Sequence, residues 1–277
     1  MTKRSFTGIM KYYLSRMTAA WVFLPAYAVI AAVITAVTVS AMGKAGLIDV
    51  FPDNYFGLNG IDTLGMFIML IFGLCYTVDF YNTAAGCGVS RRTSAIAQAV
   101  TWGISSAVIS LEGMIITAIY NAVNSGGSMM IVDLLYGSGW NRAMWGESPA
   151  LYQIKLFLLL DVIIWSCGMA GFFIGSLVYR LPRKITLILF LALPVGVISW
   201  FGNRLTVWEA QGVTDQKFEE IAVAFLDFFG MRGHAYAMGN MAKGGIVFMV
   251  LGIVCALLAY VIARRASLKT VGSRSGI

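Results

Sequence analysis

Long apolar stretches constrain the fold of this chain more than any other feature. There are six of them, at residues 19–42, 63–81, 99–123, 156–179, 185–202 and 244–263. About 20 apolar residues let a helix cross the ~30 Å hydrocarbon core of a bilayer, and the two shorter stretches can borrow flanking residues. Only 12% of the residues are charged and the mean hydropathy is +0.79, which leaves too little polar surface for a soluble globule. The pattern predicts an all-α polytopic membrane protein with six transmembrane helices in a single domain over 1–277.

The basic residues gather at alternate ends of these stretches. Those on one side are Lys3, Arg4, Lys11, Arg16, Arg91, Arg92, Arg180, Arg183, Lys184, Arg264, Arg265, Lys269 and Arg274. Short loops rich in Lys and Arg are retained in the cytoplasm, so both termini are expected to be cytoplasmic. This orientation also explains the pI near 9.3, so no nucleic-acid partner is expected.

The segment before the first stretch, residues 1–18, is amphipathic. Apolar side chains recur at spacings of three and four residues, and the basic side chains avoid that stripe, which consists of Phe6, Ile9, Met10, Tyr13, Leu14 and Met17. The spacing predicts a helix lying flat in the cytoplasmic interface, with membrane lipid as its partner. A frayed tail that merely obeys the charge rule is the alternative.

Motifs for catalysis are missing from the sequence. The single histidine, His234, rules out an HExxH metal site, and there is no GxSxG nucleophile elbow. The Gly43-Lys44 pair is followed by Ala45 rather than Ser or Thr, so the chain has no P-loop. We therefore expect no catalytic, metal-binding or cofactor-binding residues in this chain, and no enzymatic activity of its own.

The loop at 82–98, between the second and third stretches, carries an unusual run. After Gly88 releases the backbone, Ser90 can cap a new helix whose first turn carries Arg91 and Arg92. Two arginines in the first turn oppose the helix dipole, so helix stability does not explain them. They either anchor to lipid headgroups or meet the acidic residues of a partner.

The run from Gly88 to Thr93, Gly-Val-Ser-Arg-Arg-Thr, resembles the permease subunits of type 2 ABC exporters. In that family a Gly-x-Ser-Arg-Lys/Arg segment opens a short coupling helix that docks on the ATPase. The six spans, the interfacial first helix and an outer helical segment before the last span also match. The resemblance implies an ATPase-coupling role for Gly88, Ser90, Arg91, Arg92 and Thr93.

The same resemblance implies the partners and the location. ATP and Mg would be bound by a separate dimer of cytoplasmic ABC ATPase subunits, and a second permease copy or a sister permease would complete the transporter. The chain would lie in the bacterial cytoplasmic (inner) membrane. The substrate is left open among peptides, drug-like molecules and lipids.

Two carboxylates fall inside the apolar stretches, where a charge is costly unless it is paired or neutral. Glu112 lies in the outer half of the third stretch, and Asp161 lies one to two turns into the fourth. At similar depth they could line a hydrated outer vestibule on the transport pathway. The alternative is a structural role, in which Glu112 is hydrogen-bonded to Ser or Thr on neighbouring helices and Asp161 reaches water or Lys155.

The outer region at 203–243 contains a helical pattern that Gly230 ends. Its apolar stripe includes Phe218, Ile221, Phe225 and Phe229, and such a stripe must rest on lipid or on the spans. We consider an outer gate and a structural lid as the two interpretations of this segment.

Gly171 and Gly175 form a GxxxG pattern in the fourth stretch, with Gly168 on an adjacent face. Small residues at this spacing let two transmembrane helices approach closely, so a packing role is predicted.

Two other classes of function remain open at this point. An ion-coupled secondary transporter would use Glu112 and Asp161 as ion or proton sites, and a 3 + 3 inverted repeat would favour it. A membrane sensor or assembly protein that transports nothing is the other.

Overall fold

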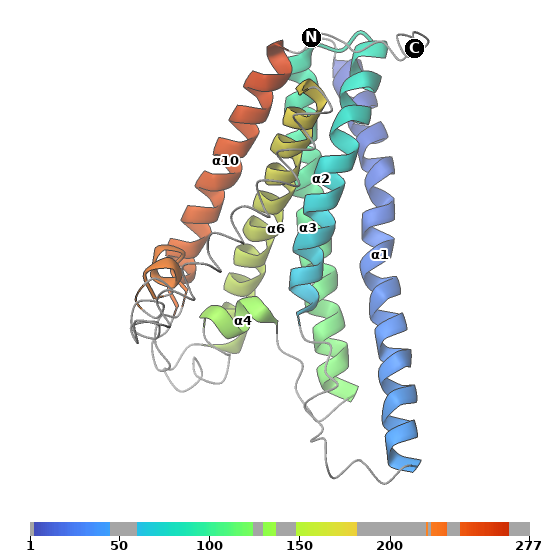
Figure 1. The fold of residues 1–277 in the computed structure, drawn as a ribbon, viewed down its shortest axis with the longest axis vertical. Helices are drawn as coiled ribbons and strands as arrows, with labels where there is room; N and C mark the ends of the chain where they lie inside the picture. The colour runs from blue at the N-terminus through green and yellow to red at the C-terminus, as the bar shows by residue number, and fades with distance from the viewer. Residues whose placement is uncertain are drawn as a thin grey trace, which may run out of the picture.

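The computed structural model describes residues 3–44, 60–123, 130–136, 148–181, 220, 223–231 and 239–265. These ranges are mostly helical and contain no strand. The helices are α1 (Lys3–Lys44), α2 (Ile61–Gly86), α3 (Arg91–Val123), α4 (Ile131–Tyr136), α6 (Pro149–Arg180) and α10 (Met241–Arg265). Figure 1 shows the five long helices as a bundle, with the short α4 lying across one end.

Five of these helices are long and apolar enough to cross a membrane. Within the described residues the candidate spans are Phe6–Val33, Ile61–Gly86, Arg91–Ala122, Pro149–Arg180 and Met241–Ile262. They contain or overlap the predicted first, second, third, fourth and sixth spans, so the prediction of a multi-pass helical membrane protein is confirmed. The predicted fifth span, 185–202, lies outside the described residues.

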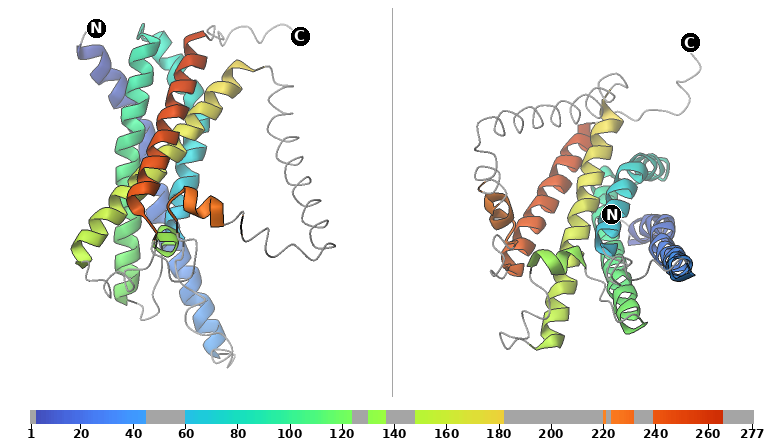
Figure 2. Two further views of the ribbon diagram at one scale, coloured as in Figure 1. Left: turned by 90° about the vertical axis from the view of Figure 1, so that its left-hand side faces the viewer. Right: turned by 60° about the horizontal axis from the view of Figure 1, so that its bottom comes forward.

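The described helices share one basic end. There α1 begins, α2 is joined to α3, and α6 and α10 finish with Arg180 and Arg265 (Figures 1 and 2). We call this the basic end and the other, near α4, the far end.

The first helix departs from the prediction of a separate interfacial helix at 1–18. α1 is one continuous helix from Lys3 to Lys44, and the candidate span begins at Phe6. The stripe of Ile9, Tyr13 and Met17 continues at spacings of three and four residues into the first span. Its buried members are Ile9, Tyr13, Met17, Ala20, Leu24 and Ala28. The stripe packs mainly on α3, with further contacts to α2, so burial against protein replaces burial in the interface.

The predicted packing role of the glycines is confirmed where α2 meets α6. A Cβ atom on Gly73 of α2 would lie 2.6 Å from the carbonyl oxygen of Gly168. A Cβ atom on Gly175 would lie 2.8 Å from the carbonyl oxygen of Leu74, and one on Gly171 would overlap that of Leu70. Only hydrogen fits at these positions, which lets the two backbones touch.

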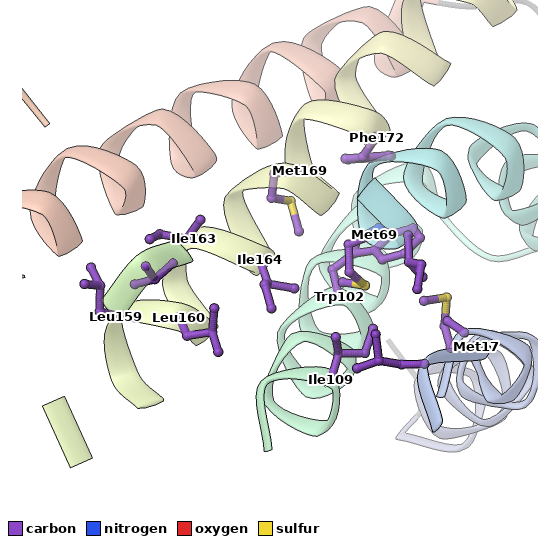
Figure 3. Close-up of a cluster of buried hydrophobic side chains, with 14 of the residues drawn as sticks. Met17, Met69, Trp102, Ile109, Leu159, Leu160, Ile163, Ile164, Met169 and Phe172 are labelled. Atoms are coloured by element: carbon purple, nitrogen blue, oxygen red, sulfur yellow. The ribbon is translucent and has the colours of Figure 1, made fainter. Parts of the chain in front are cut away.

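The core lies where α1, α2, α3 and α6 converge. Met17, Met69, Trp102, Ile109 and Ile164 are buried there, and Figure 3 shows them gathered between the four helices. Much of the remaining apolar surface is exposed, above all along α10, as expected when lipid rather than water surrounds a bundle.

Candidate functional site

We call the turn between α2 and α3 (Cys87–Ser90) the elbow. Backbone hydrogen bonds fix it to the last turn of α2. Gly88 has a φ of +66°, a left-handed conformation that glycine adopts without strain. Its N–H donates to the carbonyl oxygen of Ala85 at 3.0 Å, and the N–H of Val89 donates to that of Ala84 at 2.8 Å. This pair of bonds is a Schellman motif, so the glycine predicted to release the backbone ends α2 in a defined geometry.

Ser90 caps the following helix, as the sequence predicts. Its hydroxyl oxygen accepts a hydrogen bond from the N–H of Thr93 at 3.2 Å, and the two hydroxyl oxygens are 2.7 Å apart. The capped helix is α3 itself, which runs unbroken to Val123, so the prediction of a separate coupling helix within 82–98 is wrong. No glycine or proline interrupts the chain between Arg91 and Trp102, and the buried face of α3 already begins at Thr93.

The two arginines of the elbow differ in their surroundings. A guanidinium nitrogen of Arg91 (Nη1) donates to the backbone carbonyl oxygen of Arg264 at 2.9 Å, which ties the elbow to the last turn of α10. Arg92 is exposed. The sequence gives no reason to distinguish the two arginines, but in the structure their roles differ. Arg91 joins α3 to α10, and Arg92 faces outward.

Tyr13 of α1 anchors the first helix to the start of α3. Its ring stacks on Phe80 with centroids 4.1 Å apart, and its hydroxyl donates to the carbonyl oxygen of Phe80 at 3.0 Å. The same hydroxyl lies 2.7 Å from that of Ser94. We call the contacts of Tyr13 with Phe80 and Ser94 the tyrosine latch. Sequence reasoning missed it, because Tyr13 reads as one more apolar member of the α1 stripe.

A second polar contact stands beside the latch. Tyr12 donates from its hydroxyl to a carboxylate oxygen of Asp79 at 2.9 Å and accepts from Thr83 at 3.3 Å. The Nε of Arg16 donates to the same hydroxyl at 3.3 Å and lies 4.0 Å from Asp79. Asp79 is an acidic residue at an otherwise basic end, and that contrast is the sequence signal that could have found this cluster.

The two intramembrane carboxylates are not brought together. Ser106 donates from its hydroxyl to Asp161 at 2.5 Å, so Asp161 has a partner on α3. Glu112 lies six residues beyond Ser106, about 9 Å farther toward the far end at 1.5 Å per residue. One of its carboxylate oxygens is buried and has no hydrogen-bond partner in the described structure. The expectation of similar depth is therefore corrected: Asp161 is paired deeper in the bundle, and Glu112 stands apart from it.

The outer helical segment is described from 223 to 231, so the Phe218 and Ile221 positions lie outside the described residues. Gly230, with a φ of +69°, ends the helix as predicted, and the N–H of Met231 donates to the carbonyl oxygen of Leu226 at 2.8 Å. The ring centroids of Phe225 and Phe229 are 4.9 Å apart, and Phe229 packs on Phe248 of α10 at 5.1 Å. Phe225 itself is 60% exposed.

Polar contacts fix this segment to α4 and α10. Tyr136 of α4 donates from its hydroxyl to the carbonyl oxygen of Phe229 at 2.8 Å, and Lys243 lies 3.1 Å from Asp227. Burial raises the pKa of Tyr136 to about 12, so the hydroxyl keeps its proton at neutral pH. Asp62 of α2 in turn accepts from the N–H of Val132 at 2.7 Å. These bonds favour the structural-lid interpretation over a gate for the described part.

A groove of about 620 Å³ lies between α6 and α10 near the far end. Its walls are mainly apolar and include Leu159, Val162 and Met249, with Lys155 and Asn240 as polar members. A space of this size and character suits an apolar or amphipathic molecule.

Comparisons with known proteins add no relative from which a function could be transferred. No family model, no curated protein and no solved structure matches the chain. What is established is a multi-pass helical membrane protein with five candidate spans among its described residues.

Proposed function

We propose that this chain is the membrane-spanning permease subunit of an ATP-driven exporter of the type 2 ABC class. A separate dimer of cytoplasmic ABC ATPase subunits would bind ATP and Mg and hydrolyse the ATP. The observation that carries the proposal is the elbow, which is closed by a Schellman motif on one side, capped by Ser90 on the other, and presents Arg92 outward.

The basic end is the cytoplasmic end in this proposal. Arg91, Arg92, Arg180 and Arg264 all lie there, and short segments rich in arginine and lysine are retained in the cytoplasm. The chain would reside in the bacterial cytoplasmic (inner) membrane with both termini inside.

The length of α3 supports the placing of the elbow in the cytoplasm. Its 33 residues extend about 50 Å, whereas about 20 residues are enough to cross a hydrocarbon core of ~30 Å. More than ten residues remain for the two ends, so the elbow stands outside the hydrocarbon core and within reach of a soluble partner.

The contacts around the elbow provide the means of coupling. The tyrosine latch joins α3 to α1, and the bond from Arg91 to Arg264 joins α3 to α10. A force applied to the elbow would therefore act on four helices at once, because α2 and α3 meet there directly. Each rigid helix would carry that displacement toward the far end.

The proposal extends to the class of substrate and to the assembly of the transporter. The groove between α6 and α10 favours peptides, drug-like molecules or lipids with an apolar body. A second permease copy or a sister permease would complete the transporter, as the ATPase dimer requires one elbow for each of its subunits.

Replacement of Arg92 by Glu tests the proposal. The matched control is Lys11→Glu, which makes the same change of charge at another exposed position of the basic end. We expect Arg92→Glu to lose copurification with the ATPase subunits while Lys11→Glu keeps it, because the charge at the docking surface is reversed. Equal association of both variants would remove the elbow from its proposed role.

A further inference from the structure

One face of α3 is polar over most of its length. Its members are Ser94, Gln98, Thr101, Ser105 and Glu112, at successive spacings of four, three, four and seven residues that keep them on one side of a helix. The first four are completely or almost completely buried. The tyrosine latch shows which way this face is turned, since Tyr13 of α1 meets its first member, Ser94.

Several polar atoms on this face have no protein partner in the described structure. They are the Oε1 of Gln98, the hydroxyl of Ser105 and one carboxylate oxygen of Glu112. The Nε2 of Gln98 donates to Ser94 at 3.2 Å, and Thr101 donates to its own helix at 2.8 Å. An unsatisfied buried polar group costs about 1–3 kcal/mol, so a row of them calls for a polar occupant.

The facing side of α1 cannot supply that occupant. Its buried stripe is apolar beyond Tyr13 and consists of Met17, Ala20, Leu24 and Ala28. The indole N–H of Trp21 on α1 is itself buried and has no partner among the described residues. A buried water needs two to four polar partners, and Gln98 and Ser105, about 10 Å apart along α3, would each hold a separate water.

The polar face reaches about two-thirds of the way across the hydrocarbon core. From residue 99, where the third apolar stretch begins, to Glu112 the helix rises about 20 Å, against a core of ~30 Å. Between Ser105 and Glu112 the interval is about 10 Å, which some three waters at hydrogen-bond spacing would bridge. At the basic end the face begins with Ser94, which is 1% exposed and contacts Tyr13. The neighbouring Tyr12 and Asp79 are part-exposed.

We propose that the seam between α1 and α3 is a water-filled half-channel that conducts protons between the basic end and the carboxyl group of Glu112. A proton passes along the waters held by Gln98 and Ser105 and adds to the Glu112 carboxylate, leaving a neutral carboxyl group. On the return the carboxyl O–H releases that proton to the adjoining water. The half-channel goes beyond ATP-driven export and does not require it.

Four other titratable groups among the described residues have contacts or positions of their own. Asp62 of α2 accepts from the N–H of Val132, and Asp161 of α6 accepts from Ser106. Lys155 of α6 lines the groove against α10, and Tyr27 of α1 is exposed. Among the described residues, Glu112 is therefore the carboxylate through which the charge at the end of the half-channel changes with the pH of the basic side.

Thiol labelling tests the water in the half-channel. In a full-length chain whose four cysteines are replaced by alanine, Ser105→Cys is compared with Ser110→Cys, a hydroxyl position on the same helix that is equally buried and lacks a partner but lies off the polar face. A small water-soluble methanethiosulfonate is added from the elbow side of sealed vesicles. We expect Ser105→Cys to react at least about tenfold faster, because only a hydrated thiol ionises and reacts. Equal rates would overturn the proposal.

A second variant distinguishes a loss of water from a loss of folding. In the Ser105→Cys background, Gln98→Leu removes the middle polar group and should slow the labelling about tenfold while the elution volume in size-exclusion chromatography stays the same. Infrared spectroscopy of the chain with its native cysteines should show a Glu112 carboxyl band that exchanges rapidly in D₂O and is lost in Glu112→Gln.

Labelling of Ser105→Cys that Gln98→Leu leaves unchanged, or a carboxyl band that does not exchange, would contradict the half-channel. Neither readout involves ATP, so a failure here is distinguishable from a failure of the proposed export function.

Discussion

The hydroxyl oxygens of Tyr13 and Ser94 lie 2.7 Å apart, and this contact ties the first helix of the chain to the first turns of the third. The two residues are 81 positions apart in the sequence. Because Tyr13 also donates to the carbonyl oxygen of Phe80, a single side chain links α1, α2 and α3 beside the elbow. The elbow therefore cannot move without moving α1.

Loss of the Tyr13 hydroxyl should loosen this junction. We expect Tyr13→Phe to lower the free energy of unfolding by about 1–3 kcal/mol, because a buried acceptor loses its donor while the ring still stacks on Phe80. Unfolding in detergent micelles, followed by tryptophan fluorescence, would measure it. Tyr27→Phe, at an exposed position of the same helix, is the control and should leave stability unchanged. Equal stability of the two variants would contradict the latch.

The conformation of Gly88 gives a second prediction. Its φ of +66° costs an alanine about 1–2 kcal/mol, so Gly88→Ala should destabilise the elbow. Asparagine tolerates the left-handed region better, and Gly88→Asn should recover part of the loss. Limited proteolysis of the elbow would report the change. At Gly86, where a Cβ meets nothing within 4 Å, alanine should not increase cleavage. Cleavage that is the same for all three variants would count against a fixed elbow.

The close approach of α2 and α6 predicts an effect at Gly171. A methyl group there would overlap the carbonyl oxygen of Leu70, so Gly171→Ala should cost about 1–3 kcal/mol and broaden the size-exclusion peak. Gly113→Ala is the matched control, because a Cβ on Gly113 meets nothing within 4 Å. This control should be neutral or stabilising by up to about 1 kcal/mol. A Gly171→Ala variant as stable as the control would show that the helices are farther apart.

The bond between Ser106 and Asp161 can be measured by a double-mutant cycle. With Ser106→Ala, Asp161→Asn and the double variant, we expect a coupling energy of about 0.6 kcal/mol, with an upper value near 1.7 kcal/mol, as for other hydrogen bonds between membrane helices. A pair formed by Ser106→Ala and Glu112→Gln should show no coupling, since Glu112 lies about 9 Å farther along α3. Coupling in the second pair and not in the first would reverse our assignment of the partners.

The sequence predicted the parts of the fold that depend on local chemistry. Hydropathy located the five spans that the structure describes, because about 20 apolar residues in a row have few alternatives to a helix in lipid. Gly88, Ser90 and Gly230 were recognised as ends and caps from the backbone preferences of glycine and serine. The GxxxG pattern of Gly171 identified a packing face, although its partner Gly73 could not be read from it.

What the sequence did not predict depends on which face of one helix meets another. The stripe of α1 is amphipathic whether it lies on lipid or on α3, so its burial could not be inferred from spacing alone. Asp161 and Ser106 are 55 residues apart, and no local pattern couples them. The polar spacing from Ser94 to Ser105 was visible, yet its meaning depends on an apolar α1 lying opposite.

ATP hydrolysis by the complex that forms around this chain tests the central proposal most directly. The full-length chain, tagged at one end, is isolated in mild detergent from the membranes of the cells that produce it naturally, and hydrolysis is measured with ATP and Mg. The proposal predicts ATPase activity that copurifies with the wild-type chain and is lost with Arg92→Glu but kept with Lys11→Glu. A wild-type preparation with no more ATP hydrolysis than an unrelated tagged membrane protein would contradict it.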